Sequence, residues 1–207
     1  MTREHTTVAV RPATAADAPT MARLHADGIS EGFLPSLGPA FLTRLYRRIL
    51  RTPHAFAFVA GDADAVVGFV AGANDIAALY RSFLIRDGVP AAMSAAPRIV
   101  RSLPRVIETL RYPSRPDLPG LPDAEILAVA VARQFHGQGH GRALVDTAVR
   151  EFERRGVSAI KVVAAADNPA AQALYRSAGF VDEHELRVHA EVASIAYVRP
   201  ARTGVGA

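Results

Sequence analysis

The stretch HGQGHGRAL, residues 136–144, places three glycines at alternate positions just before a segment with helical spacing. Upstream, EILAVAV (125–131) is apolar after its first residue, which predicts a buried strand. A strand followed by a glycine loop and a helix N-terminus forms an anion site, because the first N–H groups of the helix lack partners and the helix dipole favours negative charge. The stretch therefore predicts a site for a phosphate compound.

Two common nucleotide-binding loops do not match these glycines. A Walker loop requires G-x-x-x-x-G-K-[ST], but the positions that match its last three residues hold Arg142, Ala143 and Leu144. A dinucleotide loop requires G-x-G-x-x-G, and the third glycine would fall on Arg142. A third kind of phosphate-binding loop is therefore needed.

The composition predicts one domain over residues 1–207, since half of the chain is hydrophobic and 21% is charged. There is no cysteine, which excludes disulfides, thiolate metal sites and a cysteine nucleophile. The net charge is +4, Lys161 is the only lysine, and a basic domain of this size is expected to be soluble without a nucleic-acid partner. We also expect no membrane partner and a cytoplasmic location, because no signal-peptide core or membrane span is evident.

Periodicity and turn residues predict an α/β or mixed α+β fold with a mixed sheet flanked by helices. The expected strands are 7–10, 55–60, 65–72, 125–131, 158–164, 180–190 and 191–198. The expected helices begin after Thr14 or Asp17, run over 41–50, follow the glycine loop to Arg155 with a cap at Gly156, and extend from Pro169, capped by Asn168, to Gly179. Residues 199–207 are expected to form a loose tail.

Residues 74–122 alternate helix-like pieces with prolines and are rich in arginine. They predict an added helical segment before the apolar strand, with an extended linker over 112–122. Its arginines between 81 and 115 form either a solvated basic face or a site for an anionic substrate or surface.

Two motifs resemble the GNAT superfamily of N-acetyltransferases. VARQFHGQGHGRAL (131–144) is similar to that family's acyl-coenzyme A loop, R/Q-x-x-G-x-G/A, although His136 replaces the usual Arg or Gln and Arg133 stands where proline is common. DNPAAQALYRSAGF (167–180) is similar to the family's N-x-x-A-x-x-L-Y-x-x-x-G-F segment. Residues 10–24 and 66–72 look like its first strand and helix and its third strand, so the resemblance covers most of 8–190 outside the arginine-rich segment.

The resemblance implies acetyl-coenzyme A as co-substrate and a GNAT-type twisted sheet. It assigns cofactor binding to Val129, Ala130, Val131, Gly137, Gln138, Gly139, His140, Gly141, Arg142 and Asn168. It also assigns the protonation of the departing thiolate to Tyr175. Independently of the family, Asn168 and Tyr175 are seven residues apart, which places them on nearly the same face of a helix.

The general base is less defined by the sequence. Glu125 begins the acyl-site strand, where some family members carry a glutamate base that often acts through water, but it equally suits an ordinary strand-end carboxylate. Asp123 is the next choice. Glu31 is expected to contact the amine, and Phe33 and Leu34 either line the acceptor pocket or pack beneath it. The histidines show no metal-ligand spacing, so no metal is expected.

The expected function is transfer of an acetyl group from acetyl-CoA to a primary amine, on a small molecule or amino sugar, by direct attack in a ternary complex. Three alternatives stay open: a protein or peptide N-acetyltransferase, a non-enzymatic acyl-CoA-binding regulatory module, and an interaction protein that uses the basic 81–115 face. The expected partner is a small-molecule amine, and the family resemblance makes a homodimer plausible.

Overall fold

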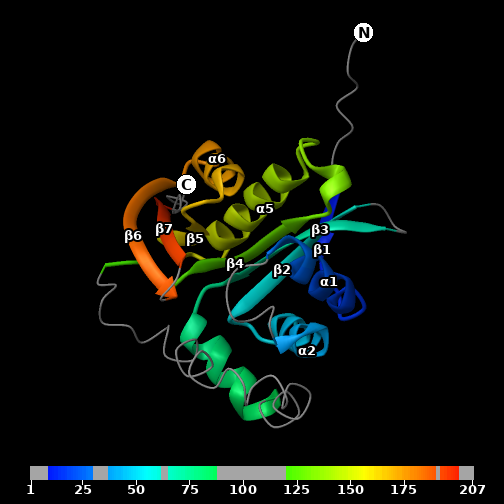
Figure 1. Ribbon diagram of the computed structural model, residues 1–207. Coiled ribbons are helices and arrows are strands. Elements are labelled where there is room, and N and C mark those ends of the chain that lie inside the picture. The colour runs from blue at the N-terminus through cyan, green and yellow to red at the C-terminus, as the bar shows by residue number, and fades with distance from the viewer. Residues whose placement is uncertain (1–8, 30–36, 62–64, 88–119, 190–191, 201–207) are drawn as a thin grey trace, which may run out of the picture.

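A seven-stranded mixed sheet forms the centre of the described structure, in the order β1-β2-β3-β4-β5-β7-β6 (Figure 1). The strands are β1 (Val10–Pro12), β2 (Ala55–Gly61), β3 (Val66–Ala73), β4 (Glu125–Val131), β5 (Ala159–Ala165), β6 (Val181–His189) and β7 (Val192–Pro200). Neighbours are antiparallel except β4 and β5, which are parallel. The computed structural model describes residues 9–29, 37–61, 65–87, 120–189 and 192–200. The predicted mixed sheet is thus confirmed.

Helices cover both faces of the sheet (Figure 1). On one face, α1 (Ala18–Gly28), α2 (Pro39–Ile49) and a helical segment over 76–87 share a core that includes Leu42, Tyr46 and Phe69. On the other, α5 (His140–Arg154) and α6 (Pro169–Ser177) share a core that includes Leu144 and Phe152. A short 3₁₀ turn, η3 (Arg133–Phe135), connects β4 to the glycine loop.

Several local predictions match the observed elements. β4 has the predicted bounds, and α6 begins at Pro169 with the Asn168 side chain accepting a hydrogen bond from the Ala171 N–H at 3.1 Å. Gly156 ends α5 in the left-handed region, with φ of 72°. These agree because caps and apolar runs are local signals.

The first strand and the first cap differ from prediction. β1 includes Arg11 and Pro12, which the sequence places after it, and Pro12 is tolerated because β1 is an edge strand. Asp17 occupies the N-cap position of α1 but its carboxylate does not bond the helix N–H groups. It instead accepts hydrogen bonds from Arg11 and Thr14 at 2.7–2.9 Å.

The predictions for the C-terminal tail and for the arginine-rich segment can be compared with the structure in part. β7 runs to Pro200, so Arg199 and Pro200 pair with β5 and do not belong to a loose tail. Residues 76–87 are helical, as expected for the start of the added segment. The remainder, 88–119, and the tail from 201 lie outside the described residues.

A β-bulge in β4 changes which way its side chains face. Ala71 pairs with Ala128 and Gly72 pairs with Ile126, so Leu127 is an additional residue opposite β3. Leu127 and Ala128 consequently both pack toward α1 and α2, whereas Ile126 and Val129 pack toward α5 and α6. The bulge reverses the alternation of the strand halfway along its length.

Candidate active site

Strands β4 and β5 separate soon after they begin. Their pairing consists of Glu125 with Lys161 and Ile126 with Val162, and β4 continues to Val131 without a further partner in β5. Backbone N–H and C=O groups on an unpaired edge require other partners. The divergence therefore leaves a wedge in the middle of the sheet where a ligand can bond to β4.

The hydrogen-bond pattern shows which groups of β4 face this wedge. The N–H of Ala132 donates to the carbonyl of Val67 in β3 at 2.8 Å. Because direction alternates along a strand, the backbone groups of Val129 and Val131 point to the opposite edge. The His136 ring donates from Nε2 to the Val131 carbonyl at 2.8 Å. The backbone N–H and C=O of Val129 and the N–H of Val131 are left for a ligand.

The glycine loop presents a set of unpaired N–H groups at the end of β4. Gly137 and Gly139 have φ of 73° and 86°, a region that favours glycine. The first helical bond of α5 runs from the Ala143 N–H to the Gly139 carbonyl at 3.0 Å. The N–H groups of residues 140, 141 and 142 therefore have no acceptor within the helix. These donors fit the pyrophosphate of coenzyme A, which the sequence predicted for this loop.

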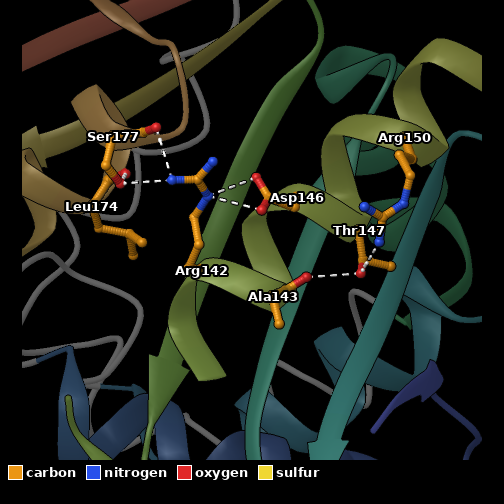
Figure 2. A network of polar contacts seen from close by, with 7 residues as sticks. All are labelled: Arg142, Ala143, Asp146, Thr147, Arg150, Leu174 and Ser177. Atoms are coloured by element: carbon orange, nitrogen blue, oxygen red, sulfur yellow. Dashed lines mark hydrogen bonds and ion pairs between the residues drawn. The ribbon is translucent and has the colours of Figure 1, made fainter. Parts of the chain in front are cut away.

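Arg142 fixes the position of α5 against α6 (Figure 2). Its Nε bonds both carboxylate oxygens of Asp146 at 2.8 and 2.9 Å, and its Nη1 donates to the Ser177 carbonyl at 2.8 Å. Nearby, a Cβ added to Gly141 would lie 3.4 Å from Leu174 of α6. The two helices are thus held closely together where they border the wedge.

Tyr175 of α6 brings a hydroxyl to the same place. Its side chain is buried against Phe180 and Tyr197, with ring centroids 6.1 and 6.2 Å apart. Its hydroxyl has no hydrogen-bond partner among the described residues, and burial raises the pKa of the phenol. Tyr175 therefore keeps its proton at neutral pH and can donate it.

These elements enclose a cleft of about 460 Å³. Of the predicted cofactor and catalytic residues, those that line it are Val129, Ala130, Val131, Gly137, Gly139, His140, Gly141, Asn168 and Tyr175. Asp27 and Gly28 at the end of α1 and Phe135 of η3 also line it, which the sequence did not predict. The cleft passes through the plane of the sheet, since α1 and α6 lie on opposite faces.

Glu125 lies outside this cleft, at the start of β4. Its side chain is 10% exposed, and its Oε2 lies 3.5 Å from the Lys161 ammonium without a hydrogen-bond partner. Lys161 also donates to the Pro122 carbonyl. Burial raises the pKa of Glu125 to about 7, and the positive charge of Lys161 opposes that rise. The carboxyl group therefore titrates near neutral pH.

The other predicted site residues have different positions. The Gln138 side chain donates to the Gln134 carbonyl, and neither Gln138 nor Arg142 lines the cleft, so their predicted roles depend on backbone N–H groups alone. Asp123 is exposed and does not line the cleft. The predicted acceptor residues Glu31, Phe33 and Leu34 lie outside the described residues.

Sequence reasoning missed the polar groups that surround Glu125. Lys161 faces it from β5, and its being the only lysine was the one available signal. Tyr80 of the 76–87 helix is close enough for the Glu125 charge to add to the burial that raises its pKa. Among the described residues, no group of three or more His, Asp or Glu is placed to hold a metal ion. No helix there is long and apolar enough to cross a membrane.

The arrangement agrees with comparison to known proteins. A model of the acetyltransferase (GNAT) family matches residues 26–180, which is most of the chain. The chain belongs to the GNAT acetyltransferase family. The resemblance recognised in the two sequence motifs is thereby confirmed.

Individual GNAT relatives match over shorter stretches. The chain is 42% identical over 60 residues to the ribosomal protein bS18-alanine N-acetyltransferase of Escherichia coli K12. That match covers 29% of this chain and 40% of the relative. It is 34% identical over 138 residues to a mycothiol acetyltransferase of Gordonia bronchialis, covering 59% and 42%. The matched stretches thus span less than half of these relatives. A ribosomal-protein-alanine N-acetyltransferase structure from Brucella melitensis superimposes with a TM-score of 0.62 at 20% identity, covering 93% of this chain and 99% of that one. That last likeness shows a shared fold.

Proposed function

We propose that this GNAT protein transfers an acetyl group from acetyl-CoA to a primary amine, on a small molecule or amino sugar. The observation that carries this proposal is the cleft itself. It joins the free N–H groups at the start of α5, the unpaired edge of β4 and the Tyr175 hydroxyl in one continuous space. A transferase that holds a long thioester and acts at its end needs these three features together.

The residues of the cleft match the parts of the co-substrate. The N–H groups of His140 and Gly141 are donors for the pyrophosphate, and the Val129 and Val131 backbone groups are partners for the amide-bearing arm. Asn168 uses its Oδ1 as a cap, which leaves its amide nitrogen for the cleft. Bound acetyl-CoA supplies the activated acetyl group, and the amine attacks it directly in a ternary complex.

Tyr175 is the proposed general acid. A thiolate leaving group benefits from a proton donor within reach, and a phenol that stays protonated can supply one. The Tyr175 hydroxyl has no competing acceptor among the described residues, and its ring is fixed by Phe180 and Tyr197. Its proton is therefore available to the cleft.

Glu125 is the proposed general base, acting through water. An alkylamine has a pKa of about 10, so it must lose a proton before it attacks. A base with a pKa near 7 is well matched to this task. Glu125 is buried and outside the cleft, so a water bonded to its Oε2, which accepts no hydrogen bond from the described residues, would have to carry the proton.

The acceptor is proposed to be a small molecule. The names of the relatives indicate which two classes of acceptor the test should compare. One relative is named for an alanine of a ribosomal protein and one for mycothiol, so both acceptor classes occur among the relatives that the chain matches. Release of coenzyme A would be measured with acetyl-CoA, first against panels of small amines and amino sugars and then against peptides with free N-termini.

The outcomes of that assay separate the alternatives. We expect turnover with members of the small-molecule panel that exceeds the turnover with peptides. Preference for peptides would contradict the small acceptor while keeping the transferase. Binding of acetyl-CoA in a calorimeter without amine-dependent turnover would indicate the non-enzymatic module.

A further inference from the structure

A second cavity, of about 510 Å³, lies away from the proposed active site. It is bordered by the end of α2, the chain entering β2 and one face of the 76–87 helix. The polar residues that line it are mostly cationic or hydroxyl-bearing: Arg48, Arg51, Thr52, Arg81, Ser82 and Arg86. Nothing in the proposed acetyl transfer uses this cavity, and no described residue lines both the cavity and the cleft.

Three of its arginines have no partner in the described chain. The side chains of Arg51, Arg81 and Arg86 are exposed and make no hydrogen bond or ion pair with any described residue. By contrast, exposed arginines of α5 such as Arg142 and Arg154 are paired with carboxylates. Unpaired guanidinium groups that face one cavity repel one another, so an anion that bridges them would be stabilising.

The fourth arginine helps to hold the walls together. Arg48 is buried, and its Nε donates to Asp87 at the far end of the 76–87 helix at 2.5 Å. This bond joins α2 to that helix. Among the described residues of the lining, Asp75 is the single carboxylate, and it accepts the Ala78 N–H at 2.7 Å. Neither carboxylate pairs with the three free arginines.

The shape and lining indicate the class of ligand. Arginine forks and hydroxyl groups are the side chains that recognise phosphoryl oxygens. The volume falls within the usual range for small-molecule sites of about 300–1,000 Å³. Ile85, which is 76% exposed, adds an apolar surface at the same cavity for an organic portion. An extended nucleic-acid surface would need a stripe of charge and not a single hollow.

We propose that this cavity binds a small phosphorylated molecule, with Arg51, Arg81 and Arg86 as its phosphoryl ligands. A ligand in this cavity would contact the same helix that lies near Glu125. The 76–87 helix presents Arg81 to the cavity, while its buried side carries Tyr80, which lies near Glu125. The proposal concerns a ligand other than acetyl-CoA and does not depend on the acetyl-transfer reaction.

The test is calorimetric titration with inorganic pyrophosphate and with ribose 5-phosphate. One molar equivalent of coenzyme A is added beforehand, so that phosphate binding at the glycine loop does not contribute. The test variant is Arg81→Gln with Arg86→Gln. The matched control is Arg44→Gln with Arg47→Gln, which removes the same charge from exposed positions of α2 that do not line the cavity.

We expect one site per chain and a Kd that rises at least tenfold in the Arg81/Arg86 variant but less than twofold in the control. Equal weakening in the two variants would overturn the proposal, because it would show only a general charge effect. Absence of binding by the unmodified protein would also overturn it. So would tighter binding of a short single-stranded RNA than of either phosphate compound, since that would identify a nucleic-acid surface.

Discussion

The two ends of strand β4 present opposite environments. At its C-terminal end the strand has separated from β5, and backbone groups of Val129 and Val131 face an open cleft. At its N-terminal end it is paired with β5, and Glu125 is buried against Lys161. One strand therefore supplies both backbone groups that face a cleft and a carboxyl group that is almost fully buried.

The two ends of β4 differ in the kind of group that each would contribute to the proposed reaction. The proposed binding at the open end uses backbone groups, which any non-proline residue provides. The proposed proton transfer at the closed end depends on one ionisable side chain, whose pKa is raised by burial and lowered by a single cation. Substitutions at the two ends should consequently affect binding and proton transfer separately.

The largest effect is expected at the open end, from Gly139→Glu. It adds a negative charge beside the free N–H groups and places a side chain on a residue with φ of 86°. We expect the Kd for acetyl-CoA to rise by about 100-fold or more, equivalent to ~2.8 kcal/mol. The matched control is Gly156→Glu, which has φ of 72° at the other end of α5. Similar losses in both variants would mean that backbone strain alone is responsible.

The next effect is expected for Tyr175→Phe. Loss of the acid should lower kcat by ~10²–10⁴-fold while the Kd for acetyl-CoA stays unchanged. Tyr197→Phe is the control, because it removes a buried, unpartnered hydroxyl from a ring that contacts Tyr175. Steady-state rates and calorimetry would measure both quantities. An unchanged kcat in the Tyr175→Phe variant would remove the acid role.

The closed end is tested by the pH dependence of kcat/KM. With the pKa of Glu125 at about 7, activity should rise with pH below 7 and level off above it. Glu125→Gln should abolish that inflection and lower the plateau. Lys161→Met should move the inflection to higher pH, because the ammonium favours the ionised carboxylate. An inflection that persists in the Glu125→Gln variant would assign the base elsewhere.

A stability measurement tests the raised pKa of Glu125 separately from any catalytic role. Because the pKa of Glu125 is raised above its ordinary value of 4.5, the folded state holds a proton that the unfolded state has lost. The free energy of unfolding should therefore fall as pH rises from about 4.5 to 7. Glu125→Gln should remove that slope whether or not Glu125 takes part in catalysis.

The smallest effect is expected for Arg142→Gln, which loosens the contact of α5 with α6. The Arg142 side chain is 47% exposed, so its pair with Asp146 contributes little, and the bond to the Ser177 carbonyl matters more. We expect Tm to fall by ~2–4 °C. Arg150→Gln, which loses only a local bond to Thr147, should change Tm less in the same calorimetric scan. An equal fall would show that the inter-helix bond has no special part.

The open end is more predictable from sequence than the closed end. The glycine loop, the cap at Asn168 and the bounds of β4 are short-range features, and each can be recognised from adjacent residues. The pairing of Glu125 with Lys161 joins residues 36 positions apart through sheet register, which no local pattern encodes. The predicted capping role of Asp17 is wrong for a different reason, because Arg11 competes for its carboxylate.

The extra residue in β4 also sets the phase of the strand. Residues four apart on a regular strand share a face, yet Glu125 and Val129 belong to opposite faces because Leu127 intervenes. Deleting Leu127 would restore regular alternation but leave Glu125 and Val129 three positions apart, so they would still face opposite sides of the sheet. Straightening the bulge with all seven residues kept in the strand would instead put the two positions in phase, and the carboxyl group and the Val129 side chain would then face the same side.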